Sequence, residues 1–216
     1  MEAPSLQLPH FAAVRWPAQL LGLRNNPRFT AVYRLAEACR YEAVHAHQVT
    51  RLALKMFNQT AALHRRDPRL RYLLACSALL HDIGYIDGKA GHHKSSLRRI
   101  CTSSLLNWSA RRRRIVGSIA RYHRKALPCE RHNHFADLNA VDRRRVELLG
   151  GLLRLADGLD RGHRCLVRDL QIDFHPRKLT VICHAPECPD WLDRSAQNKL
   201  DLLERAADRV VRVEWN

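Results

Sequence analysis

Histidine and aspartate side chains occupy inward positions of several helices that the sequence predicts. In the segment CSALLHDIGY, residues 76–85, apolar residues at helical spacing lead to His81, Asp82 follows directly, and Gly84 is expected to end the helix. In other predicted helices, steps of three or four residues from apolar positions lead to three further ionisable residues: His45, His123 and Asp157. Four separate helices are therefore expected to direct an ionisable side chain into the core.

The carboxylates in this set restrict its chemistry. A single buried histidine is most often an ordinary core residue that hydrogen-bonds a carbonyl oxygen. A buried carboxylate without a partner is costly, so Asp82 and Asp157 require a cation, hydrogen-bond donors or a proton. Because imidazole and carboxylate ligands together suit first-row divalent metals, the pattern favours a metal centre.

The charge balance indicates an anionic partner. The 216 residues include 37 Lys plus Arg against 21 Asp plus Glu, a formal net charge of +16, and such a field attracts anions. Nucleic acid, nucleotides, polyphosphate or an acidic protein all fit this charge. An arginine-rich composition without functional meaning is the alternative explanation.

Composition and patterning favour a cytoplasmic protein that does not contact a membrane. The 46% hydrophobic content is ordinary for a globular chain, and the seven cysteines show no regular disulfide framework. No apolar run approaches the roughly 18 residues of a membrane helix. The N-terminal residues also lack the basic and apolar regions of a signal peptide.

Apolar periodicity predicts a mainly α protein with a small C-terminal α+β appendage. Helices are expected at about 28–40, 42–64, 68–82, 92–106, 109–124 and 141–160. After them, RDLQIDFH and KLTVICH predict a hairpin, WLDRSAQNKLDLLERAADRV predicts one amphipathic helix, and VVRVEW predicts a closing strand. The expected units are an N-terminal arm or short packing helix (1–26), a helical domain (27–164) and the appendage (165–216).

Four segments resemble known phosphohydrolases. The order His45, then His81-Asp82, then Asp157 is similar to the H...HD...D signature of HD-domain metal-dependent phosphohydrolases, which are helical bundles. The segments EAVHAHQVTRLALKMF, LLHDIGYIDGKAGHHKSSL, IARYHRKALP and LRLADGLDRGH resemble the C-terminal half of the exopolyphosphatase and guanosine pentaphosphate phosphohydrolase (Ppx/GppA) family. The resemblance covers roughly residues 27–216. That family's actin-like phosphatase module is not in this sequence, so exopolyphosphatase activity is not carried over.

The resemblance implies a two-metal site. One metal would be held by His45, His81, Asp82 and Asp157, and a second by His92 and His123, with Asp82 bridging the two. His93 competes with His92 as the ligand because the two are adjacent. The expected cofactor is one or two divalent transition metals per chain, from Mn, Fe, Co and Zn, with Mg as an alternative. Open coordination positions at such a site suit catalysis.

Several cationic side chains near the expected ligands are candidates for phosphate binding. They are Lys94, Arg121, Arg124, Lys125 and Arg161, together with His93. The alternative for each arginine is a solvated helix face. Lys94 and Lys125 lie directly beside expected ligands and are assigned to the catalytic set with His81 and Asp82.

Two hypotheses follow. The first is a metal-dependent phosphohydrolase that acts on a small phosphorylated compound, either a nucleotide or a phosphoanhydride. The second is a non-catalytic module that binds polyphosphate, a nucleotide or a partner phosphatase. Nucleic-acid binding rests on charge alone and ranks last, and the sequence leaves a homodimer open.

Overall fold

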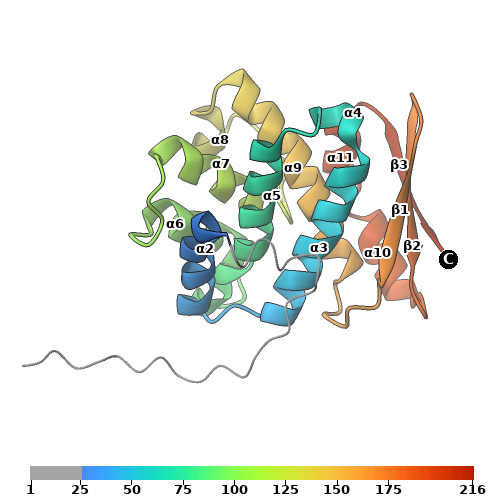
Figure 1. Ribbon diagram of the computed structural model, residues 1–216, viewed down its shortest axis with the longest axis horizontal. Coiled ribbons are helices and arrows are strands. Elements are labelled where there is room, and N and C mark those ends of the chain that lie inside the picture. Colours follow the sequence, from blue (N-terminus) through green and yellow to red (C-terminus); the bar gives the residue numbers. More distant parts are fainter. Residues whose placement is uncertain (1–25) are drawn as a thin grey trace, which may run out of the picture.

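The computed structural model describes residues 26–216 and is mainly helical, with a small sheet at its C-terminal end (Figure 1). Before the sheet come α2 (Pro27–Ala38), α3 (Ala43–Gln59), α4 (Ala61–His64), α5 (Pro68–Leu80), the 3-10 helix η2 (Ile83–Asp87), α6 (His92–Thr102), α7 (Ala110–Arg121), α8 (Asn133–Ala136) and α9 (Ala140–Leu159). The later elements are β1 (Asp169–Phe174), β2 (Lys178–His184), α10 (Asp190–Gln197), α11 (Asp201–Ala207) and β3 (Val210–Trp215). The predicted fold class is confirmed. The predicted N-terminal arm lies outside the described residues, apart from residue 26.

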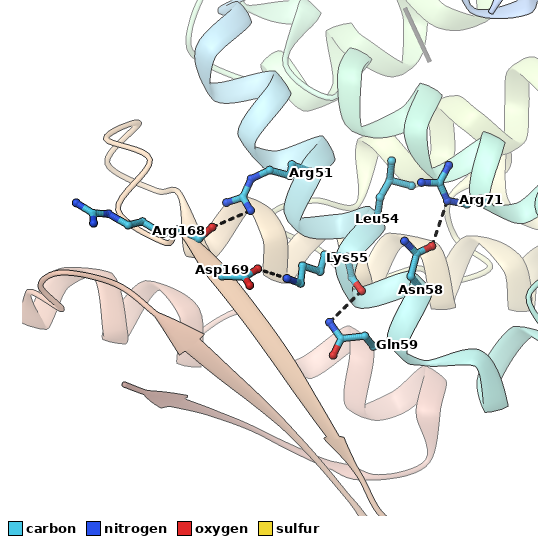
Figure 2. Close-up of a pocket in the computed structure, with 8 residues that line it drawn as sticks. All are labelled: Arg51, Leu54, Lys55, Asn58, Gln59, Arg71, Arg168 and Asp169. Carbon is cyan, nitrogen blue, oxygen red and sulfur yellow. Dashed lines mark hydrogen bonds and ion pairs between the residues drawn. The ribbon is translucent and has the colours of Figure 1, made fainter. Parts of the chain in front are cut away.

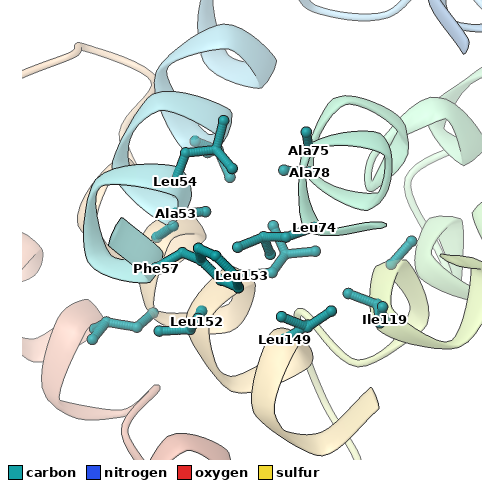
Figure 3. Packing of buried hydrophobic residues seen from close by; sticks show 14 of the residues in the cluster. Ala53, Leu54, Phe57, Leu74, Ala75, Ala78, Ile119, Leu149, Leu152 and Leu153 are labelled. Atoms are coloured by element: carbon teal, nitrogen blue, oxygen red, sulfur yellow. The ribbon is translucent and has the colours of Figure 1, made fainter. Parts of the chain in front are cut away.

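Apolar faces of α3, α5, α7 and α9 form the core of the helical part (Figure 3). Phe57, Leu74, Ile119 and Leu153 each come from a different one of these helices and are buried. Burying such a side chain contributes roughly 1.5–3 kcal/mol, so this core holds the four helices in place. Within the described part of the chain, no helix combines the length and apolar character needed to cross a bilayer.

Side-chain caps set the starts of two helices that carry or precede candidate ligands. Asp67 accepts a hydrogen bond from the backbone N–H of Arg69, and Pro68 occupies the first turn of α5. Asn139 caps α9 by accepting from the backbone N–H of Asp142. α5 starts at residue 68 as predicted, and α9 starts at residue 140, one residue before its predicted start.

The predicted helix at 42–64 is interrupted at Thr60. This residue has φ −105° and ψ 37°, outside the helical region, and its hydroxyl donates to the carbonyl oxygen of Met56 at 2.9 Å. The hydroxyl competes for a backbone acceptor, which favours the break. α6 also ends at Thr102, earlier than the predicted residue 106, because Ser103 adopts an extended conformation.

The predicted single helix near the C-terminus is wrong. It is divided into α10 and α11 by a break at 198–200. In this break Leu200 is buried and Lys199 extends to α9, where its Nζ donates to Asp157 Oδ2. Tertiary contacts therefore override the local amphipathic pattern.

The three strands form one sheet in the order β1-β2-β3. β1 and β2 are the predicted antiparallel hairpin, and β3 pairs in parallel with β2, with Lys178 opposite Val210. Figure 1 shows α10 and α11 between α9 and this sheet. α11 packs closely on α9, because a Cβ at Gly151 would lie 2.8 Å from Leu203 Cα. The appendage is thereby joined to the helix that carries Asp157.

Candidate metal centre

Side chains from α3, α6 and α9 and from the turns that follow α5 and α7 converge in two groups. Within each group the potential ligand atoms all lie within 4.8 Å of one another. The first group is His45, His81 and Asp157, and the second is Asp82, His92 and His123. All are buried except Asp82, whose side chain is 12% exposed. The structure thus brings together every residue that the sequence analysis named as a metal ligand.

Asp82 offers one carboxylate oxygen to each group. Its Oδ2 lies 3.4 Å from His81 Nε2 and 3.8 Å from His45 Nε2. Its Oδ1 lies 3.3 Å from His92 Nε2 and 3.4 Å from His123 Nε2. The geometry is therefore that of a carboxylate placed to bridge two metal positions.

Asp157 completes the first group from α9. Its Oδ1 lies 3.5 Å from His45 Nε2 and 3.8 Å from His81 Nε2. Its other oxygen, Oδ2, accepts a hydrogen bond from Lys199 Nζ at 2.7 Å, and the same ammonium donates to the carbonyl oxygen of His123 at 2.8 Å. One oxygen of Asp157 faces the group, while the C-terminal appendage holds the other.

The imidazole rings are oriented by their outer nitrogen atoms. His45 Nδ1 donates to Asp160 Oδ2 at 2.8 Å. The other three rings donate from Nδ1 to backbone carbonyl oxygens: His81 to Ala78 at 2.7 Å, His92 to Lys89 at 3.0 Å and His123 to Ala120 at 2.6 Å. In the neutral form of each ring, Nδ1 carries the proton and Nε2 presents a lone pair to the centre, as in metal-binding histidines.

Several of the inward-facing atoms lack a hydrogen-bond partner among the described residues. They are Nε2 of His45, Nε2 of His81 and Oδ1 of Asp82. In the second group, Nε2 of His92 and Nε2 of His123 face each other at 3.4 Å, and two facing lone pairs repel without a cation between them. Bonds of about 2.1 Å to one metal place neighbouring ligand atoms roughly 3.0–3.4 Å apart, close to the observed separations. The donor set therefore fits divalent metal ions.

The acid and base groups of the centre influence one another strongly. Burial lowers the pKa of His45, but the carboxylates of Asp157 and Asp160 outweigh burial and raise this pKa to about 10, so a metal at Nε2 would displace the second proton of this ring. Burial raises the pKa of Asp82, yet the surrounding imidazoles hold it below its ordinary value. Burial likewise raises the pKa of Asp157, and the Lys199 ammonium and nearby imidazoles lower it well below its ordinary value. Both carboxylates are therefore ionised and able to bind a cation.

Burial dominates the titration of two further groups. It lowers the pKa of His123 well below the ordinary value, so this imidazole is neutral and able to act as a ligand. It also lowers the pKa of Lys199, against the opposing effect of Asp157. The ion pair of Lys199 and Asp157 is thus held in a largely desolvated position.

Gly84 allows α6 to approach closely enough to supply His92. A Cβ at residue 84 would lie 2.0 Å from the carbonyl oxygen of His92 and 2.6 Å from the backbone nitrogen of Ser96. The N–H of Gly84 also donates to Ser96 Oγ at 2.9 Å. The expectation that Gly84 ends a helix is wrong: α5 ends at Leu80, and Gly84 lies inside η2.

A cavity of about 560 Å³ opens onto Asp82. Three cationic residues line it: Arg40, Lys89 and Arg161. Tyr85, another lining residue, stacks on His92 with 3.9 Å between ring centroids. Glu42 also lines the cavity and is paired with His163 at 2.5 Å. The cavity offers an anionic ligand a cationic wall beside the bridging carboxylate.

A second cavity, of about 550 Å³, lies between α3 and β1 (Figure 2). Figure 2 shows three of the cations that line it held by the chain itself: Arg51 by the carbonyl oxygen of Arg168, Lys55 by Asp169, and Arg71 by Asn58. Neither of the two potential metal-binding groups contributes a residue to this cavity. We assign no function to it.

The structure separates the side chains that the sequence analysis expected to bind phosphate. Arg161 lines the cavity with Asp82, and Arg124 Nη1 donates to His92 Nε2 at 3.3 Å. The others do not line that cavity: His93, Lys94, Arg121 and Lys125. His92, rather than His93, belongs to the group with Asp82. The side chains of Lys94 and Lys125, which were expected to be catalytic, are exposed at the surface.

Sequence reasoning missed residues that surround the ligands. Asp160 follows Asp157 by three residues, so helical spacing was a usable signal for it. Lys89 and Arg40 line the cavity but carry no motif in the sequence. Lys199 gave no signal, because its pattern is that of an ordinary lysine on an amphipathic helix.

Comparison with known proteins places the chain in a family. None of the curated proteins compared with the chain matches it. A family model described as Ppx/GppA phosphatase, domain III, matches residues 28–206, which include both ligand groups and most of the C-terminal appendage. The match covers far more than half of the sequence. The chain therefore belongs to the Ppx/GppA phosphatase family, through domain III of that family.

Proposed function

We propose that this protein is a metal-dependent phosphohydrolase of the HD type. The observation that carries the proposal is the placement of Asp82, which gives one oxygen to each ligand group and lines the cationic cavity. Membership of a phosphatase family related to exopolyphosphatases supports a phosphorylated substrate. The substrate class is a phosphate ester or anhydride of a small molecule, either a nucleotide or a phosphoanhydride.

The residues of the centre would hold one or two divalent transition metals. His45, His81 and Asp157 form one position and His92 and His123 the other, with Asp82 shared. Metals at such a centre supply Lewis-acid chemistry for hydrolysis of phosphate esters and anhydrides. The outer hydrogen bonds of the imidazoles keep every Nε2 directed inward, so the ligand set is preorganised before any metal enters.

The cavity residues provide the binding of the substrate. Arg40, Lys89 and Arg161 attract a phosphoryl group and orient it toward Asp82. Glu42 does not cancel this charge entirely, because three cations face it and it pairs with His163. Tyr85 covers one face of His92 and keeps part of the ligand set from bulk water.

The test is elemental analysis of the purified chain and of the variant Asp82→Ala, combined with assays of nucleotides and phosphoanhydrides. We expect one or two equivalents of transition metal and hydrolysis in the wild type, and loss of both in the variant. Asp87→Ala is the matched control, since it removes an aspartate of the adjacent η2 that pairs with Arg98 and Arg99 rather than with a ligand. Full hydrolysis by Asp82→Ala would refute the mechanism.

A second candidate function is a binding module without catalysis. The specific observation in its favour is the cationic wall of the cavity, which attracts anions with or without a metal. On this alternative, Asp82→Ala retains affinity for polyphosphate or a nucleotide, and the metal-loaded wild type hydrolyses neither. Equilibrium binding and hydrolysis measured on the same two proteins separate the two functions.

A further inference from the structure

A group of basic side chains lies behind the second ligand group, away from the cavity with Asp82. We call it the Arg121 cluster; it consists of His93 at the start of α6, Arg121 at the end of α7, and His134 in α8. The ring of His93 packs against that of His92, with 5.6 Å between centroids. None of the three residues lines the cavity that contains Asp82.

Arg121 is buried without an acidic partner. The residue is only 5% exposed, and its Nη1 atom has no hydrogen-bond partner among the described residues. Nor does any carboxylate in the described part of the chain form an ion pair with it. Its guanidinium lies 5.7 Å from the ring centroid of Tyr122, a contact that supplies no acceptor oxygen. A buried guanidinium in this state is costly and requires an anion or ordered water.

The other members of the Arg121 cluster are also unsatisfied. Nδ1 of His93, which is 6% exposed, and Nε2 of His134 have no hydrogen-bond partner among the described residues.

α6 and α7 pack side by side in opposite directions: Arg113 Nη1 donates to the carbonyl oxygen of Cys101, and a Cβ at Gly117 would meet Leu97. One further turn along each helix places Arg121 beside His93. The hydroxyl of Ser118, on the same last turn of α7, donates to the carbonyl oxygen of His134 at 3.4 Å. Three neighbouring residues therefore each carry an unpartnered nitrogen atom, and neutral imidazoles can donate as well as accept hydrogen bonds.

The surroundings of the cluster are almost entirely positive. The charged groups that act on its imidazoles are Lys94, Arg114, Arg124, the neighbouring histidines and one acid, Asp137. Asp137 does not neutralise Arg121, because it is paired with Arg114 at 3.4 Å and its side chain is 55% exposed. The start of α6, which has no side-chain cap, adds the positive end of a helix dipole next to His93. The positive surroundings and the unpartnered nitrogen atoms of the cluster therefore both favour a bound anion.

We infer that the Arg121 cluster is an oxyanion site that binds a phosphate-type dianion by hydrogen bonds from Arg121, His93 and His134. Guanidinium groups hold phosphate oxygens as a fork, and each oxygen accepts more than one hydrogen bond. This site is separate from the metal centre and does not depend on hydrolysis. Ordered water in place of the anion is the alternative, and the experiment excludes one of the two.

The experiment is titration of the full chain with inorganic phosphate by calorimetry, at constant ionic strength in chloride. It is performed in the Asp82→Ala background as well as in the wild type, so that phosphate at the metal centre is not counted. We expect the Asp82→Ala background to retain one equivalent of phosphate, and we compare all further variants in that background. Arg121→Gln should weaken binding at least about tenfold, because it removes a charge-assisted hydrogen bond.

Two further variants keep the test decisive. Arg131→Gln changes an exposed arginine that acts on His132, outside the cluster, and should leave the phosphate affinity unchanged. His134→Ala alters a partly exposed member and should weaken phosphate binding even if Arg121→Gln fails to fold. Absence of phosphate binding beyond a chloride control would overturn the inference in favour of water, as would wild-type affinity in Arg121→Gln or in His134→Ala.

Discussion

The two ligand groups of the candidate metal centre are built differently. In the first group, charged side chains support two of the three ligands: Asp160 holds the ring of His45, and Lys199 holds one oxygen of Asp157, while His81 donates to a backbone carbonyl oxygen. In the second group, backbone carbonyl oxygens orient His92 and His123. The first group therefore depends largely on side-chain partners distant in the sequence. The second uses local carbonyl oxygens and depends on the close approach of α6 to Gly84.

This difference predicts unequal metal positions. A carboxylate that accepts from an imidazole raises the basicity of that ligand more than a carbonyl oxygen does, so the first position should bind its metal more tightly. At the second position, a metal must compete with Arg124 for the lone pair of His92 Nε2, because Arg124 already donates a hydrogen bond to this atom. Variants that affect one group and spare the other test this comparison.

The largest effect is expected from Gly84→Ala. The new Cβ would meet backbone atoms of His92 and Ser96, which cannot move without shifting α6. We expect a loss of about 3 kcal/mol in the free energy of unfolding and loss of the second metal, measured by chemical denaturation and elemental analysis. Gly150→Ala is the control, because its Cβ would meet the tip of Leu202 at 3.3 Å and Tyr122 Cβ at an ordinary contact distance of 3.8 Å, and no backbone atom. Retention of both metals in Gly84→Ala would contradict the dependence on backbone approach.

An intermediate effect is expected from Asp160→Ala. His45 then loses the acceptor of its Nδ1 proton, so affinity at the first position should fall by about 10- to 100-fold, while the second position keeps its metal. Calorimetric titration of the metal-free protein with Mn²⁺ measures both positions. Glu42→Gln is the control: it removes the charge of a carboxylate that pairs with His163, whose ring stacks on His45, and leaves the Nδ1 hydrogen bond of His45 intact. Equal weakening at both positions would remove the distinction between the groups.

The smallest effect is expected from Lys199→Met. The substitution leaves Asp157 free to turn its second oxygen, so we expect the first position to weaken by about tenfold. Asp201→Asn is the matched control: it removes the ion pair with Arg154 between the same two parts of the chain without touching a ligand. The absorption spectrum of Co²⁺-loaded protein should change in Lys199→Met alone. An identical change in Asp201→Asn would assign the effect to loosening of the appendage.

Local patterns in the sequence predicted the helices that carry the ligands and the hairpin that follows them. His45 and Asp157 lie on apolar helix faces with regular spacing, and burial of such a face is a local property of a helix. His123 was predicted on such a face and is buried two residues beyond the end of α7. The breaks at Thr60 and at 198–200 were not predicted, because the residues around them keep an amphipathic pattern. There, hydrogen bonds and contacts formed only in the folded chain decide the conformation.

By itself, the sequence determined which residue types face the core and therefore that carboxylates and imidazoles would be buried together. Only the tertiary structure decided that the two oxygens of Asp82 face different groups, that His92 rather than His93 joins it, and that Lys199 reaches Asp157. The physical reason is the range of the interactions. Periodicity reports the inward side of each helix, whereas atomic separations between helices depend on how close their backbones pack, as at Gly84.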